Sequence, residues 1–147
     1  MKPTRRGSDP PVHRPEKTPR FQIQLDKWPL SPGTPREASG VKRIYYIHGV
    51  PNEARRGGHA HISLRQILFC PYGKIEIILD DGHKRESILL DDPSKGLVIG
   101  PGLWREMIWH QENSVLCVAA SEYYDAKDYI CDYDTFLQYV NVGKIHG

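Results

Sequence analysis

The chain has 147 residues, of which 39% are hydrophobic and 26% are charged, and its formal net charge is +2. This length suits one domain, and the apolar fraction is sufficient for a packed core. So small a net charge gives no reason to expect nucleic acid as a partner. No apolar run approaches the ~18 residues that a membrane-spanning helix needs, so no membrane partner is expected either.

Three cysteines, Cys70, Cys117 and Cys131, form no C-x-x-C pair and are odd in number. This pattern argues against a disulfide framework or a zinc knuckle and for free thiols. The basic start of the chain is not followed by the apolar segment of a secretory signal. We therefore expect a cytoplasmic protein.

Residues 1–20 carry six basic and two acidic side chains, and eight of the 12 prolines occur at or before Pro35. Val12 is the only sizeable apolar residue in this stretch apart from Met1. Such a segment buries too little apolar surface to offset the entropy of ordering it. The sequence predicts a disordered, basic, proline-rich tail over residues 1–20 and one domain over residues 21–147.

Short strands with turns between them dominate the rest of the chain. Phe21, Ile23 and Leu25 alternate with polar residues, as in a half-buried strand, and residues 29–40 are predicted to form a loop. Asp81-Gly82 predicts a two-residue hairpin turn. β-Branched and aromatic residues between turn signals predict eight further strands: Arg43–His48, His59–Ile62, Gln66–Cys70, Lys74–Leu79, Arg85–Leu90, Leu97–Gly100, Arg105–Trp109 and Ser114–Ser121.

Only the end of the chain has a helical pattern. Asp132 or Asp134 is suited to cap a helix over Thr135–Val140. Many short strands and one terminal helix predict an all-β antiparallel sandwich or barrel, and we favour a double-sheet jelly roll with a short C-terminal helix.

Arg56-Gly57-Gly58-His59-Ala60-His61 holds the densest chemistry. Two histidines at i and i+2 on a strand point to the same face, so both imidazoles enter one cavity. The glycines let the backbone bend or a ligand approach, and Arg56 offers a planar cationic fork. Imidazoles near neutral pH are suited to proton transfer.

The spacing of this segment resembles the first motif of the cupin superfamily, in which His-x-His is followed by an acid and then a glycine. Gln66 stands where a metal-binding cupin has its glutamate, and the region of the second motif offers Trp104 and Arg105 instead of a histidine. Two histidines alone make a poor site for a divalent metal. We therefore favour a cavity without a metal or other cofactor.

A closer resemblance extends over residues 41–140, because several blocks occur in the order and spacing of the nucleotide-sugar 3,4-ketoisomerases, a cupin family. The blocks are Lys42-Arg43-Ile44-Tyr45-Tyr46-Ile47, Arg56 to His61, Leu79-Asp80-Asp81-Gly82, Gly96 to Pro101, Trp104-Arg105-Glu106, Ala119 to Asp125 and Asp128-Tyr129-Ile130.

The resemblance implies a cofactor-independent, homodimeric cupin-type jelly roll. Such an enzyme moves the ketone of dTDP-4-keto-6-deoxyglucose, or of a close relative, from carbon 4 to carbon 3 for deoxyamino-sugar biosynthesis. By position, His59 is the expected acid–base at carbon and His61 the proton shuttle between the two oxygens, with the opposite division left open.

Four further residues are expected by resemblance to bind substrate. Tyr45 and Arg56 would orient the sugar and stabilise the charge of the enediol. Trp104 and Arg105 would line the same cavity, and Arg105 would influence which face of the enediol is reprotonated.

Two other functions remain open at this point. A metal-dependent cupin oxygenase would need a third ligand from His48, His83 or His110. A non-catalytic sugar-nucleotide-binding cupin would need no paired acid and base.

Overall fold

The computed structural model describes residues 22–24 and 40–145. The predicted tail over residues 1–20, the two ends of the predicted first strand and all but the last residue of the predicted loop over residues 29–40 lie outside the described residues.

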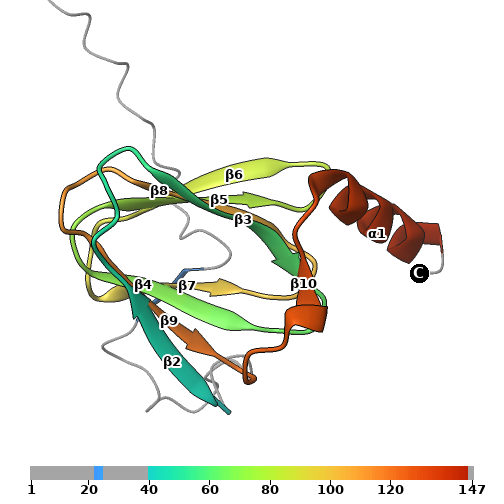
Figure 1. Cartoon of the computed structure of the whole chain (residues 1–147), viewed down its shortest axis with the longest axis horizontal. Coiled ribbons are helices and arrows are strands. Elements are labelled where there is room, and N and C mark those ends of the chain that lie inside the picture. Colours follow the sequence, from blue (N-terminus) through green and yellow to red (C-terminus); the bar gives the residue numbers. More distant parts are fainter. Residues whose placement is uncertain (1–21, 25–39, 146–147) are drawn as a thin grey trace, which may run out of the picture.

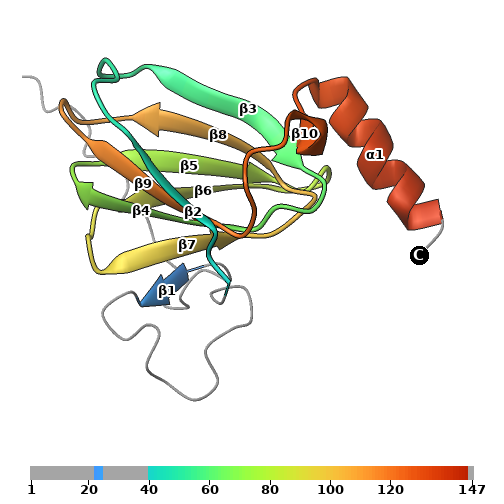
Figure 2. The same ribbon diagram turned by 60° about the horizontal axis from the view of Figure 1, so that its bottom comes forward.

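Two five-stranded antiparallel sheets lie face to face (Figure 1). The first sheet has the strand order β1 (Gln22–Gln24), β7 (Lys95–Ile99), β4 (Gln66–Tyr72), β9 (Val115–Ala120) and β2 (Arg43–Ile47). The second has the order β10 (Tyr129–Ile130), β3 (Arg55–His61), β8 (Trp104–Trp109), β5 (Ile75–Asp80) and β6 (Arg85–Leu90). Figure 2 shows β1 beside β7 at the edge of its sheet. This arrangement confirms the predicted cupin-like double-sheet fold.

Alternation along the strands sends one set of side chains into the space between the sheets. Most of this space is apolar core, and the buried residues that fill it include Leu68, Ile75, Ile77, Leu79, Leu97, Met107, Trp109, Leu116 and Val118. Polar side chains occupy the same inner faces where β3 meets β8 and where β4 meets β9. These polar positions form the site described below.

All eight strands predicted between residues 43 and 121 are present, with ends shifted by a few residues. β3 starts at Arg55, four residues earlier than expected, because a bulge carries the strand through the two glycines. Residues 81–84 connect β5 and β6, since Asp80 pairs with Arg85, and the Asp81 amide donates to the Lys84 carbonyl around Gly82 and His83. The hairpin turn is therefore present, centred one residue later than the expected Asp81-Gly82.

The C-terminal helix α1 (Tyr133–Ile145) lies at one end of the sandwich, outside β3 and β10 (Figures 1 and 2). Asp132 caps it by accepting hydrogen bonds from the amide and hydroxyl of Thr135, at 2.9 and 2.8 Å. Phe136 is fully buried against Trp104 and Ile130, which fixes the helix to the outer face of the second sheet. No helix in the described part of the chain is long and apolar enough to cross a membrane.

Candidate active site

A β-bulge in β3 brings the functional side chains of this strand to one face. His59 pairs with Arg105 and Gly57 pairs with Glu106, which leaves Gly58 as the extra residue. Gly57 has a φ of +87°, and a Cβ there would lie 3.0 Å from the backbone oxygen of Arg105. Both features require glycine at this position. Arg56 pairs with the buried Met107 but is itself exposed, and it is not among the residues that line the cavity described below.

The two imidazoles meet edge to face, with 4.9 Å between ring centroids. The ring of Tyr129 completes the group, at 5.0 Å from His59 and 4.4 Å from His61. Tyr129 reaches this position because β10 pairs with β3, opposite His61. The sequence-based expectation that both histidines enter one site therefore agrees with their placement.

Asp128 anchors His61. The Nδ1 atom of His61 lies 3.1 Å from Oδ2 of Asp128, in the 3₁₀ turn Ala126–Asp128 just before β10. A carboxylate only accepts, so Nδ1 of a neutral His61 carries the proton and donates it. The second ring nitrogen, Nε2, is then a free lone pair. It is buried and has no hydrogen-bond partner among the described residues.

Asp128 is itself held rigidly. Its Oδ1 accepts hydrogen bonds from the amide and hydroxyl of Ser63, at 2.8 and 2.7 Å, and its Oδ2 accepts one from the amide of Leu64 at 3.1 Å. Burial raises the pKa of Asp128, but these hydrogen bonds outweigh that effect and lower it below the usual value. Asp128 is therefore an ionised, positioned acceptor for His61.

Both histidines are neutral at pH 7. Burial, and then the positive charge of Arg105, lower the pKa of His59 to about 3. The same two causes lower the pKa of His61 to about 4, against the opposing effect of Asp128. A neutral imidazole is the form that accepts a proton.

Arg105 is a fully buried cation behind the histidines. Its Nη1 donates to Oε1 of Gln66 at 2.6 Å and its Nη2 donates to the carbonyl of Leu103 at 3.0 Å. Burial lowers its pKa to about 10, so the guanidinium remains charged at neutral pH. Gln66, on β4 of the facing sheet, in turn donates to the hydroxyl of Tyr45 on β2 of that same sheet.

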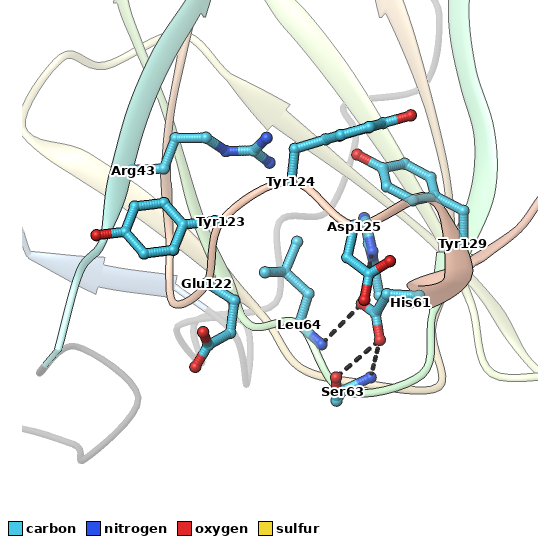
Figure 3. Close-up of a pocket in the computed structure, with 10 residues that line it drawn as sticks. Arg43, His61, Ser63, Leu64, Glu122, Tyr123, Tyr124, Asp125 and Tyr129 are labelled. Carbon is cyan, nitrogen blue, oxygen red and sulfur yellow. Dashed lines mark hydrogen bonds and ion pairs between the residues drawn. The ribbon is translucent and has the colours of Figure 1, made fainter.

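A cavity of about 370 Å³ opens beside this group (Figure 3). Its lining residues come from β2, from the end of β3 and the turn after it, from the segment after β9 and from β10: Arg43, His61, Ser63, Leu64, Glu122, Tyr123, Tyr124, Asp125, Asp128 and Tyr129. Arg43 lies over the Tyr45 ring, 4.9 Å from its centroid, and reaches toward Tyr124. Tyr45, His59 and Arg105 are thus directly behind residues that line the cavity.

The structure separates Trp104 from the other expected substrate-binding residues. Neighbouring residues on a strand face opposite sides, so Trp104 points outward when Arg105 points inward. The Trp104 ring packs against Tyr133 and Phe136, with centroids 5.2 and 5.7 Å away. Trp104 is therefore a packing residue beneath α1, and its expected contact with substrate finds no support in its position.

No group of three or more His, Cys, Asp or Glu side chains suited to a metal ion occurs in the described ranges. His110 is one of the histidines considered as a third ligand, and it contacts Glu53 and Glu76 instead of the site. In addition, Gln66 is bound to a guanidinium, whose charge opposes a metal cation at that point.

Comparison with known proteins decides the family. A family model described as "FdtA: WxcM-like, C-terminal" matches residues 38–141. The chain belongs to this family.

Three relatives that are 46% identical to this chain share one activity. The TDP-4-oxo-6-deoxy-alpha-D-glucose-3,4-oxoisomerase of Aneurinibacillus thermoaerophilus is 46% identical over 100 residues, which span 68% of this chain and 72% of that protein. The sugar 3,4-ketoisomerase QdtA of Thermoanaerobacterium thermosaccharolyticum, solved with TDP, is 46% identical, with a TM-score of 0.67 over 69% of this chain and 74% of that one. A 3,4-ketoisomerase from Helicobacter canadensis is also 46% identical, with a TM-score of 0.67 over 69% and 76%. The expected family and activity are confirmed: this FdtA-like protein is a sugar 3,4-ketoisomerase.

Two residues of the site, Asp128 and Tyr129, were not predicted from the sequence. Asp128 lies far from His61 in the chain, and neither it nor Tyr129 was expected to belong to the site. The one available signal was the block Asp128-Tyr129-Ile130, which resembles the family but suggested no role for the carboxylate.

Proposed function

We propose that this enzyme moves the ketone of TDP-4-keto-6-deoxyglucose from carbon 4 to carbon 3 by proton transfer through an enediol, without a metal or an organic cofactor. Two relatives support the substrate: one is named for this sugar nucleotide, and a histidine-to-asparagine mutant of QdtA was solved in complex with it. The observation that carries the proposal is the free Nε2 of His61, held as a base by Asp128.

His61 is the base that we assign to carbon, in place of the division first expected from resemblance. Its Nε2 removes the proton from carbon 3, and the electron pair of that C–H bond forms the carbon 3–carbon 4 double bond. The oxygen on carbon 4 takes up the displaced electrons and then a proton, which gives the enediol. Donors that face this oxygen stabilise the developing charge.

The second half restores a ketone. The hydroxyl on carbon 3 loses its proton to His59, the protonated His61 gives a proton to carbon 4, and the double bond becomes a carbonyl at carbon 3, which returns the enzyme to its starting protonation state. His59 is suited to carry protons between the two oxygens, since a neutral imidazole both donates and accepts. Tyr45 and Arg56 are proposed to orient the sugar, and the buried charge of Arg105 is proposed to stabilise negative charge from behind the histidines.

Proton NMR of TDP-4-keto-6-deoxyglucose with the enzyme in deuterium oxide, with a chelator present, tests this proposal. We expect the 3-keto sugar to appear with deuterium at carbon 4, and the spectrum also gives the configuration there. Isomerisation that stops when the chelator is added would overturn the cofactor-independent mechanism. Absence of both isomerisation and exchange in a folded sample would overturn the substrate.

We propose that the enzyme acts as a homodimer in the cytoplasm. The edge strand β2 exposes two large apolar side chains, Ile44 at 72% and Tyr46 at 65%, and such edges commonly pair with a partner. Cys70, Cys117 and Cys131 are free thiols, as suits a reducing compartment. Sedimentation equilibrium tests the dimer, and a Tyr46→Glu variant should shift the mass toward the monomer.

A further inference from the structure

Gln66 connects the two sheets at the site. It lies on β4, is 3% exposed, and contacts a side chain on each side of the gap. Nη1 of Arg105, on β8, donates to its Oε1 at 2.6 Å, and its Nε2 donates to the hydroxyl oxygen of Tyr45, on β2, at 3.3 Å. Three side chains thus form one hydrogen-bonded chain across the sandwich.

The donors and acceptors of these two hydrogen bonds can be assigned in only one way. A guanidinium has no acceptor, so the amide oxygen of Gln66 must face Arg105. The amide nitrogen then faces Tyr45, and since NH₂ only donates, the Tyr45 oxygen must accept. The proton of the Tyr45 hydroxyl is left for another acceptor, and none takes it within residues 22–24 and 40–145.

The free proton of Tyr45 lies in the catalytic group. Arg105 interacts electrostatically with Tyr45, His59 and His61, so all four belong to one cluster. Burial raises the pKa of Tyr45, which therefore keeps its proton at neutral pH. A neutral hydroxyl that accepts from Gln66 keeps its own proton free to donate toward the site.

We propose that Gln66 is a positioning residue that makes Tyr45 a donor to the ketone oxygen of the substrate. The inference rests on the ketoisomerase function proposed above, because the ketone oxygen gains negative charge when the base removes the proton from carbon 3. A donor already aimed at that oxygen lowers the barrier without reorganisation.

The amide is essential to this role. A carboxylate at position 66 would accept from Arg105 and also from Tyr45. The Tyr45 proton would then point toward residue 66, and the hydroxyl would present its lone pairs to the substrate oxygen. Gln66→Glu therefore reverses the direction of the Tyr45 O–H bond and hardly changes the shape of residue 66. Metal-binding cupins have glutamate at the corresponding position.

Gln66→Glu is the test, with Gln66→Met as the matched control. The glutamate variant should lower kcat about 100-fold, the size seen when one oxyanion donor is lost, with KM changed by less than about threefold, as expected of an interaction made in the transition state. Gln66→Met removes both hydrogen bonds but leaves Tyr45 able to donate, so we expect a loss of about tenfold or less. If the role of Gln66 were purely structural, Gln66→Met would lower kcat more than Gln66→Glu, because methionine leaves Arg105 without its hydrogen-bond partner.

Double variants with Tyr45→Phe show whether Gln66 acts through Tyr45. In the phenylalanine background, Gln66→Glu and Gln66→Met should each change kcat by less than about threefold, because the proton that they redirect is gone. The proposal is overturned if the fold-losses in kcat of the two single variants multiply in the double variant. It is also overturned if the Gln66→Glu enzyme is as active as the original. If Gln66→Glu does not fold, the cycle with Gln66→Met decides it. An inactive original enzyme would instead contradict the proposed function, so the two failures are distinguishable.

Discussion

The Nδ1 atom of His61 lies 3.1 Å from Oδ2 of Asp128, although 67 positions separate them in the chain. The contact forms because β10 pairs with β3 and brings the turn before β10 against the turn after β3. It selects the tautomer of His61 that leaves Nε2 as a base. The same pairing places Tyr129 against both imidazoles.

Asp128→Asn tests the tautomer. The new amide is able to donate to Nδ1, which would place the imidazole proton on Nε2 and remove the base. We expect kcat to fall about 100-fold or more, with little change in the far-UV circular dichroism spectrum. His61→Gln should lower kcat by at least as much.

Ser63→Ala is the control for this variant. It deletes one hydrogen bond to the same carboxylate but leaves the His61 contact in place. We expect kcat to remain within about fivefold of the original, because the amides of Ser63 and Leu64 still hold the carboxylate in place. An Asp128→Asn enzyme no slower than Ser63→Ala would show that Asp128 merely holds the turn.

The low pKa values of the two site histidines predict how stability varies with pH. Unfolded histidine binds a proton near pH 6.5, whereas folded His59 and His61 do so at about 3 and 4. Between these values the unfolded state holds more protons, so the free energy of unfolding decreases as pH falls from about 6.5 toward 4. The lowered pKa of Asp128 acts in the same direction at the acid end.

Urea unfolding at pH 7.0 and pH 5.0 measures this dependence. A His59→Gln/His61→Gln variant should lose less stability than the original protein over the same interval. Equal losses of stability in the two proteins would show that other groups determine the pH dependence. In kinetics, kcat/KM should stay nearly flat from pH 8 to pH 6, because His61 is neutral throughout.

Alternation and turn signals were sufficient to predict the sheets, since strands buried on one face repeat every two residues. β10 has only two residues, too few to show a period, and it exists because β3 offers an unpaired edge. α1 extends beyond the predicted Thr135–Val140 at both ends. Its first residue, Tyr133, packs its ring on Trp104, a tertiary contact that periodicity does not report.

The part of the site that lies on a single strand was predictable from the sequence. His59 and His61 share a strand, so their spacing alone places them together. Arg105 and Trp104 are adjacent, and their sequence gives no sign of which one faces inward, because that depends on how β8 pairs with β3 and β5. Asp128 is brought in by β10, which the sequence did not reveal.

Trp104→Phe tests the placement of this ring outside the site. It shortens a side chain that packs under α1, so we expect the free energy of unfolding to fall by about 1–2 kcal/mol. KM and kcat should remain within about twofold, because Trp104 faces away from the histidines. A several-fold rise in KM with unchanged stability would return Trp104 to the substrate site.

His110 should contribute to stability with a pH dependence opposite to that of the site histidines. Its Nε2 lies 2.7 Å from Oε1 of Glu76 and its Nδ1 lies 3.3 Å from Oε1 of Glu53. The Glu76 contact, together with that of Glu53, raises the pKa of His110. The folded state therefore holds this proton more tightly than the unfolded state. The stabilisation is complete below about pH 6.5 and is lost as pH rises through the folded pKa.

His110→Gln should therefore cost more stability at pH 6.0 than at pH 9.0, by about 1 kcal/mol or less because the contacts are partly exposed. Thermal unfolding at the two pH values measures the difference, with His48→Gln as the control at an exposed histidine. Hydrogen bonds to Glu76 from Ser87, and then from His110, lower the pKa of that carboxylate, so the contact should persist well below pH 6. Equal losses for His110→Gln at both pH values would show that the imidazole contributes through packing and neutral hydrogen bonds, and not through its charge.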